Sequence, residues 1–191
     1  MSTKIERETK ETKISLELSL YGEGENSIET GIGFFDHMLE AFSKHSLIDL
    51  NLKCQGDIEV DFHHSVEDVG IVIGKALRKE IYPIEKVERF GEAGVVMDEA
   101  LVSTTMDLSN RAFLYFDLKC DGDIGDFDTE LVEEFFRALT FNAGISAHIS
   151  TIRGKNKHHI VEAAFKSFAV ALRRAVTKNE RVKIPSTKGV L

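Results

Sequence analysis

Two histidine pairs, each followed by a glutamate, are the residues of this chain best suited to chemistry. The first pair lies in the stretch DFHHSVEDVG, which covers residues 61–70. On a helix, His63 and Glu67 are four residues apart and share a face, while the side chain of His64 is turned about 100° away. The two neighbouring imidazoles therefore point in two directions, and only one of them pairs with the carboxylate.

The second pair repeats this arrangement in the stretch HHIVEA. Here His158 and Glu162 share a face, and His159 is turned aside. Neutral imidazole nitrogens together with carboxylate oxygens suit manganese, iron, zinc or nickel, and spacing of i and i+4 lets one helix supply two ligands. Each motif offers two ligands to one ion and one ligand to another, so the two motifs predict two metal ions.

Aligning the two motifs together with the sequence before each of them adds two candidate ligands. His37, in FFDHML, precedes His63 by 26 residues, and Glu134, in LVEEFF, precedes His158 by 24 residues. The alternative for Glu134 is a solvated helix carboxylate beside Glu133, and the pattern leaves both interpretations open. A single HxxxE pattern is common on solvated helices. The prediction of a metal site therefore depends on finding the pattern twice.

The remaining histidines and the cysteines give weaker signals. His45 lies on the same helix face as His37. His148 falls in a predicted strand, where we expect a packed or surface residue rather than a ligand. Cys54 and Cys120 have no CxxC spacing, so we expect small buried apolar residues rather than a disulfide or a zinc site.

The composition is that of an ordinary soluble globular protein. The chain has 191 residues, of which 42% are hydrophobic and 29% charged, and its formal net charge is -8. This charge opposes binding to nucleic acid. No apolar run approaches the roughly 18 residues that would span a bilayer, and the polar start MSTKIERETKETK lacks the apolar stretch of a secretory signal. We therefore expect a cytoplasmic protein that binds neither nucleic acid nor membrane.

Alternating apolar and polar residues predict strands, and helical spacing of apolar residues predicts helices. Strands are expected at 13–20, 48–62, 100–109, 112–120 and 144–152, and helices at 34–45, 65–81, 129–141 and 159–176. Each half runs in the order helix, strand or strands, loop, HHxxE and helix, which indicates a duplication. We expect one α+β domain over residues 1–191, with pseudo-repeats at about 1–92 and 93–191.

A series of spaced motifs runs through the chain from end to end. They are RETKET, TGIGFFDHML, GDIEVDFHHSVEDVGIVIGKAL, ERFGEAGVVMDEALV, DLSNRAFLYFDL, FDTELVEEFFRAL, GKNKHHIVEAAFKSFAVALRRA and IPSTKGVL. In this order they closely resemble the imidazoleglycerol-phosphate dehydratase family. The resemblance implies an internally duplicated fold, in which each half is a four-stranded sheet with two helices (ribosomal protein S5 domain 2-like). It also implies a 24-subunit homo-oligomer with metal sites between subunits.

The resemblance further implies two Mn²⁺ ions per active site. One ion would be held by the set His37, His64, His158 and Glu162, and the other by the set His63, Glu67, His159 and Glu134. Many relatives carry histidine at the last of these positions. The glutamate here makes the second ligand set more anionic, which affects its metal preference.

The family's reaction, as the resemblance implies it, removes water from D-erythro-imidazole glycerol phosphate and gives imidazole acetol phosphate in histidine biosynthesis. The substrate has no carbonyl that would acidify the departing C–H. Coordination of both ring nitrogens as an imidazolate would help to expel the hydroxyl and give a diazafulvene, whose neighbouring C–H is acidic. The resemblance makes Glu11 the catalytic acid–base and a substrate-binding residue. The other substrate-binding positions are His45, Arg89, Arg111, Lys166, Ser186, Thr187 and Lys188, most of which would bind the phosphate.

Two other functions use the same ligand types. A dinuclear metallohydrolase acting on a small phosphorylated substrate would need a bridging hydroxide and an open site for its electrophile. A metal-binding or storage protein would take up metal tightly and would not depend on Glu11. Only the dehydratase reading predicts that the basic residues and the C-terminal Ser-x-Lys bind one phosphate.

Overall fold

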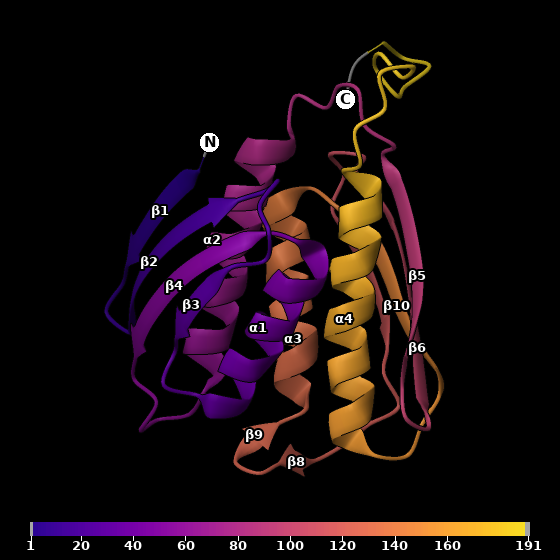
Figure 1. Cartoon of the computed structure of the whole chain (residues 1–191). Coiled ribbons are helices and arrows are strands. Elements are labelled where there is room, and N and C mark those ends of the chain that lie inside the picture. The colour runs from indigo at the N-terminus through magenta and orange to yellow at the C-terminus, as the bar shows by residue number, and fades with distance from the viewer. Residues whose placement is uncertain (1, 190–191) are drawn as a thin grey trace.

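Two four-stranded sheets enclose a double layer of helices in the computed structural model of the chain, which describes residues 2–189 (Figure 1). The first sheet has the order β1-β2-β4-β3, and the helices α1 and α2 cover its inner face. The elements of this half are β1 (Thr3–Glu8), β2 (Thr12–Ser19), β3 (Asn26–Glu29), α1 (Gly33–Ser46), β4 (Asp49–Gly56) and α2 (His63–Ile81).

The second half repeats the first in the order and direction of its elements. Its sheet has the order β5-β6-β10-β7, and in each sheet only the last strand of this order runs parallel to its neighbour. The elements are β5 (Phe90–Met97), β6 (Ala100–Asp107), β7 (Phe113–Asp117), α3 (Glu130–Ala143), β10 (Ser146–Arg153) and α4 (Lys157–Ala175). A short hairpin of β8 (Asp123–Ile124) and β9 (Phe127–Asp128) precedes α3. The predicted duplicated α+β fold is confirmed, although the expected boundary between residues 92 and 93 falls inside β5.

The core lies between the two helix layers and between each layer and its sheet. Helix α2 packs on α3 and α1 on α4, so the two halves share one continuous core. Two glycines allow α2 and α3 to approach closely. A Cβ on Gly70 would lie 2.8 Å from the carbonyl oxygen of Phe135, and one on Gly74 would lie 2.5 Å from that of Leu139.

Two predicted strands are too long, and the one expected at 112–120 is reduced to β7 at Phe113–Asp117. The expected strand at 48–62 ends at Gly56, because its partner β2 begins at Thr12, which pairs with Gly56. The following residues form a turn in which the N–H of Val60 donates to the carbonyl of Asp57, over 2.8 Å. Alternation of apolar residues therefore continued beyond the point where a neighbouring strand was available to pair.

All four helices begin at the end of the molecule that carries β8 and β9, and the tail after α4 lies at the opposite end (Figure 1). The connections enforce this direction, because α1, α2 and α3 each follow the lower end of a strand or hairpin and lead back to the upper end of the next strand, whereas α4 follows β10 and leads into the tail (Figure 1). The first turns of the helices therefore form one end of the molecule, which we call the helix-start end.

Candidate metal centre and substrate-binding residues

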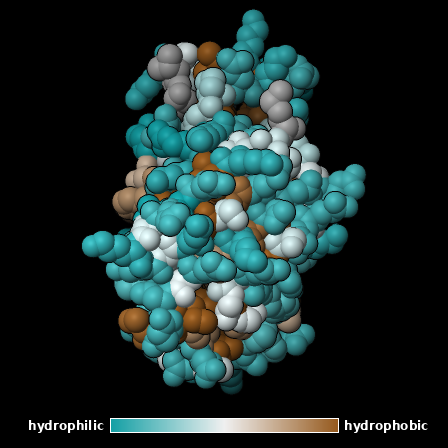
Figure 2. Space-filling model, turned by 90° about the vertical axis from the view of Figure 1, so that its left-hand side faces the viewer, coloured by the Kyte–Doolittle hydropathy of each residue, from teal (hydrophilic) through white to brown (hydrophobic). Residues whose placement is uncertain are grey.

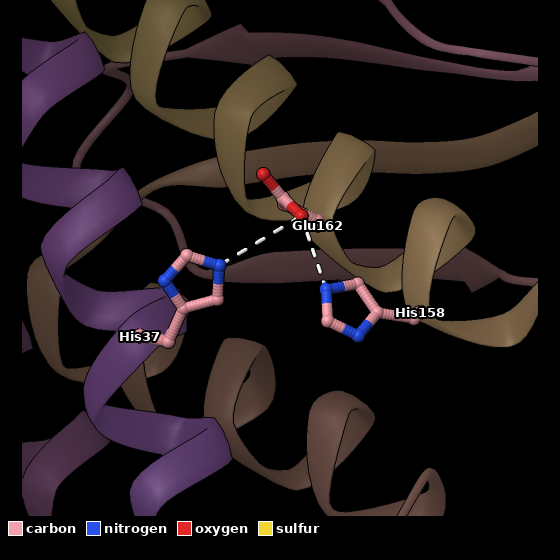
Figure 3. A group of neighbouring side chains, drawn as sticks. All are labelled: His37, His158 and Glu162. Carbon is pink, nitrogen blue, oxygen red and sulfur yellow. Dashed lines mark hydrogen bonds and ion pairs between the residues drawn. The ribbon is translucent and has the colours of Figure 1, made fainter.

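Three predicted ligands meet at the helix-start end. His37 projects from α1, and His158 and Glu162 project from α4 (Figure 3). The Oε2 atom of Glu162 lies 3.2 Å from His158 Nε2 and 3.9 Å from His37 Nε2. One ligand atom from each residue lies within 4.8 Å of the others. The packing of α1 on α4 therefore assembles a two-nitrogen, one-oxygen group from both halves of the duplication.

The two carboxylate oxygens of Glu162 have different neighbours. Lys166 Nζ lies 2.5 Å from Oε1, one turn further along α4, so Oε2 alone faces the two imidazoles. Burial by itself raises the pKa of Glu162, but the hydrogen bond and charge of Lys166, together with His37 and His158, outweigh it and lower the pKa. The carboxylate is therefore anionic at neutral pH, which is the form that ligates metal.

A second, more open group lies nearby on α2 and α3. His63 Nε2 is 3.9 Å from Glu67 Oε2, as the i,i+4 spacing predicted. Glu134 lines the same surface hollow as His63, together with Asp61 and Leu131. Two of the four expected ligands of the second ion, His63 and Glu67, are thus in contact. A third, Glu134, lines the same hollow as His63.

The second histidine of each motif lies apart from these groups. His64 Nδ1 is 3.1 Å from Asp57 Oδ2, and its Nε2 is 3.8 Å from Glu11 Oε1. His159 Nδ1 is 2.7 Å from Glu99 Oε2, and its Nε2 is 3.8 Å from Asp98. Within residues 2–189 of one chain, neither imidazole belongs to the group formed by His37, His158 and Glu162.

These carboxylates also set the protonation of the two imidazoles. The hydrogen bond that His64 donates to Asp57 raises the pKa of His64, and the one that His159 donates to Glu99 raises the pKa of His159. The hydrogen bond from His159 has the largest effect on Glu99, and bonds from two backbone N–H groups add to it. Together they lower the pKa of Glu99 to about 2. Sequence reasoning did not find Asp57 and Glu99. The signal for Asp57 was its place seven residues before His64, whereas Glu99 stands 60 residues from its histidine and gave none.

Arg89 and the tail residues Ser186–Lys188, which are expected to bind phosphate, lie at the end opposite to the helix starts. The backbone N–H of Arg89 donates to the carbonyl of Ala175, the last residue of α4, over 2.8 Å. The guanidinium of Arg89 binds Asp107 in a bidentate pair at 2.6 and 3.0 Å and donates to the carbonyl of Pro185 over 2.6 Å. The last bond brings the tail residues next to Arg89.

The other residues expected to bind substrate lie in the tail, before β7 and on the helices α1 and α4. Ser186 Oγ accepts from the N–H of Lys188 over 3.2 Å, and Thr187 lies exposed between them. Arg111 is exposed just before β7. His45, near the end of α1, has its pKa lowered by burial and then by the charges of Lys166 and Arg173. Lys166 lies in the middle of α4, between the two ends of the molecule, and its charge acts on His45.

The donors at the helix-start end fit a divalent metal ion. They are imidazole nitrogens and anionic carboxylate oxygens, a mixture that suits manganese, iron and zinc, and the closest three are already gathered around one point. The fold and this group of donors together define an internally duplicated α+β protein with a histidine–carboxylate site that could bind metal.

Comparison with known proteins defines the family. The family model described as Imidazoleglycerol-phosphate dehydratase matches residues 30–172. The chain is 67% identical to the Imidazoleglycerol-phosphate dehydratase of Campylobacter hominis, over 97% of each chain, and 65% identical to that of Campylobacter curvus, over 98% and 97%. The crystal structure of the Staphylococcus aureus enzyme superposes with a TM-score of 0.86 at 40% identity and covers 94% of this chain and 100% of that one.

The chain belongs to the imidazoleglycerol-phosphate dehydratase family. It is accordingly an enzyme of the carbon–oxygen lyase class, and its family belongs to histidine biosynthesis. This classification favours the dehydratase reading of the sequence over the hydrolase and metal-storage readings.

Proposed function

We propose that the chain dehydrates D-erythro-imidazole glycerol phosphate to imidazole acetol phosphate with two Mn²⁺ ions, at sites completed by other copies of the same chain. The observation that carries the proposal is the group of His37, His158 and Glu162, found in a member of a dehydratase family. Its three donors leave coordination positions for further ligands and for substrate.

The ligand sets follow from the geometry and the family match together. His37, His158 and Glu162 would be joined by His64 from another copy. His63, Glu67 and Glu134 would likewise be joined by His159. Bound Mn²⁺ would supply Lewis-acid chemistry, stabilising the deprotonated form of the substrate's imidazole ring, whose electron density helps the neighbouring hydroxyl to leave.

Glu11 is the proposed acid–base residue. It lies at the tip of the β1–β2 hairpin, and its Oε1 atom is 3.8 Å from His64 Nε2. Two backbone bonds hold the hairpin tip, since the N–H of Glu11 donates to Thr9 Oγ1 over 3.1 Å and its carbonyl accepts from Asp57 over 3.1 Å. A carboxylate held beside a proposed metal ligand can take a proton from a ring-bound carbon chain and return one to it.

The metal group and Arg89 of one chain are too far apart to bind the ring and the phosphate of the same substrate molecule. His158 stands in the first turn of α4, whereas Arg89 bonds to the carbonyl of Ala175 at its last residue. At 1.5 Å per residue these points are about 26 Å apart along the helix. A three-carbon chain between ring and phosphate is far shorter. The basic end of one copy would therefore complete the metal-binding end of another.

The outward faces of the two sheets support self-association. The first sheet turns a mostly hydrophilic face outward (Figure 2). The second sheet, although built in the same order, exposes large apolar side chains, which are Phe90, Val96, Phe113, Tyr115 and Ile152. Tyr115 also stacks on His148 of the neighbouring strand, which is a surface residue as expected. Apolar surface of this kind marks an interface, and we propose that it lies between subunits of a 24-subunit homo-oligomer.

The cytoplasmic location stays a prediction. Among residues 2–189, no helix has the length and apolar character needed to cross a membrane.

Restoring metal to stripped protein tests the proposed function. Chelator-treated protein is incubated with imidazole glycerol phosphate, with and without added Mn²⁺, and imidazole acetol phosphate is followed. We expect turnover only with Mn²⁺. Equal turnover by stripped protein in the presence of excess chelator would contradict the proposal.

A further inference from the structure

Both halves of the molecule make the same contact at the second histidine of the HHxxE motif. In the first half, His64 Nδ1 lies 3.2 and 3.1 Å from the two carboxylate oxygens of Asp57. In the second half, His159 Nδ1 lies 2.7 Å from Glu99 Oε2. A carboxylate accepts but does not donate, so each imidazole carries its hydrogen on Nδ1. The unprotonated lone pair of the neutral ring is then on Nε2.

We propose that Asp57 and Glu99 are positioning residues, which fix the tautomer and ring orientation of His64 and His159 so that each ring presents Nε2 to a metal ion. The inference rests on the proposed function, in which these two histidines are ligands. A carboxylate on the distal nitrogen of a metal-binding imidazole also increases the basicity of the ligating nitrogen. Neither carboxylate belongs to the two proposed ligand sets.

Bonds that do not involve the histidine anchor each acceptor residue. Glu99 Oε1 accepts the backbone N–H groups of Lys155 and Asn156, over 3.1 and 2.8 Å, and this leaves Oε2 for His159. Asp57 is fixed through its backbone, since its N–H donates to the carbonyl of Glu11 and its own carbonyl accepts from Val60. The Glu99 carboxylate is therefore oriented without its histidine, and the main chain that carries the Asp57 carboxylate is fixed in the same way, as expected of positioning groups rather than of chance surface pairs.

The duplication alone does not explain the repeated contact. Asp57 follows β4, which corresponds to β10 in the second half. Glu99 lies in the turn between β5 and β6, which corresponds to the β1–β2 turn that carries Glu11. Two non-equivalent places in the repeat thus supply a carboxylate to the same nitrogen of equivalent histidines.

Manganese titration of the full-length protein tests the inference. Metal-stripped wild type, Asp57→Ala and Glu99→Ala are titrated with Mn²⁺ alone, and free Mn²⁺ is followed by its electron paramagnetic resonance signal. We expect each variant to bind one class of site about 10- to 100-fold more weakly than wild type and to keep the other class. Asp57→Asn and Glu99→Gln retain an oxygen acceptor and should bind with intermediate affinity.

Matched controls remove carboxylates near the same elements. Glu59→Ala lies in the same turn as Asp57, and Glu92→Ala lies on the same strand that leads to Glu99; both side chains are exposed. We expect wild-type Mn²⁺ affinity from both controls. Thermal unfolding shows which variants are folded, and the Asn and Gln variants carry the test if an alanine variant does not fold.

The outcomes separate this inference from the function on which it rests. If wild type takes up no Mn²⁺, the proposed metal sites are wrong, and this inference is wrong with them. If wild type binds Mn²⁺ and the folded Asp57 and Glu99 variants bind it equally well, the positioning role is overturned and the proposed function stands.

Discussion

Glu162 combines two roles at the level of a single side chain. One oxygen binds Lys166 at 2.5 Å and the other faces His37 and His158, so the residue stays ionised although only 7% of its side chain is exposed. Removing the lysine would leave a buried carboxylate with weaker support for its charge. Lys166 thus contributes to the metal-binding form of the site.

A substitution at Glu11 should affect proton transfer without affecting metal binding. Glu11→Gln keeps the size of the side chain and removes its ability to exchange a proton, so we expect turnover to fall by about 10²-fold or more. Uptake of Mn²⁺ should be unchanged, because Glu11 is outside both ligand sets. Steady-state assays of imidazole acetol phosphate formation and a Mn²⁺ titration give the two readouts.

Glu8→Gln is the matched control for this prediction. Glu8 lies on the same hairpin and makes only an exposed ion pair with Lys13 at 3.4 Å, so both turnover and Mn²⁺ uptake should match wild type. Wild-type turnover by Glu11→Gln would contradict the acid–base role of Glu11.

Local spacing determined which site residues the sequence could predict. His63 with Glu67, and His158 with Glu162, are related by helical geometry, so their contacts followed from the motifs alone. His37 was found as a candidate ligand only by aligning the two halves, and its Nε2 atom lies 3.9 Å from Glu162 Oε2. The partners of His64 and His159 depend on loops and turns, whose positions hydrophobic periodicity does not fix.

The position of a strand in its sheet, central or at the edge, explains which strands could be predicted from the sequence. The central strands β2, β4, β6 and β10 alternate clearly, because one of their faces is buried. The edge strands β1, β3 and β5 were missed, since β1 and β3 are rich in polar residues and β5 contains two glycines. All four helices were predicted to within a few residues, because each has a long apolar stripe facing the core.

The α2–α3 contact holds the two halves together and should tolerate no added volume. In Gly74→Ala, the new methyl group would lie 2.5 Å from the backbone carbonyl of Leu139, so the helices must separate. We expect a loss of about 1–3 kcal/mol in the free energy of unfolding. Denaturant titration followed by circular dichroism measures this change.

Gly33→Ala is the control for the α2–α3 prediction. Gly33 is also helical, but a Cβ there meets nothing within 4 Å. Its stability should match or exceed that of wild type, because alanine is the better helix former. Equal stabilities for Gly74→Ala and wild type would show that α2 and α3 can separate at little cost, contrary to the close packing described here.

Self-association should depend on the second sheet and not on the first. Tyr115→Glu places a charge in the exposed apolar face of the second sheet, where burial in an interface would be costly. We expect this variant to form a smaller species with reduced turnover, since sites shared between copies would be lost. Size-exclusion chromatography with light scattering gives the mass, and the dehydration assay gives the turnover.

Ser15→Glu is the control for the self-association prediction, because Ser15 faces outward from the polar first sheet. It should keep the mass and turnover of wild type. A fully active monomeric wild type, or an unaltered assembly of Tyr115→Glu, would contradict the proposed interface.

The number of metal ions per chain is the most direct test of the two proposed Mn²⁺ sites. Each chain contributes eight proposed ligands, and four ligands per ion give two ions per chain, whichever copies share them. Elemental analysis of fully active, dialysed protein should therefore find two manganese ions per chain. Full activity in protein that contains no transition metal would rule out a dehydration that depends on these two sites.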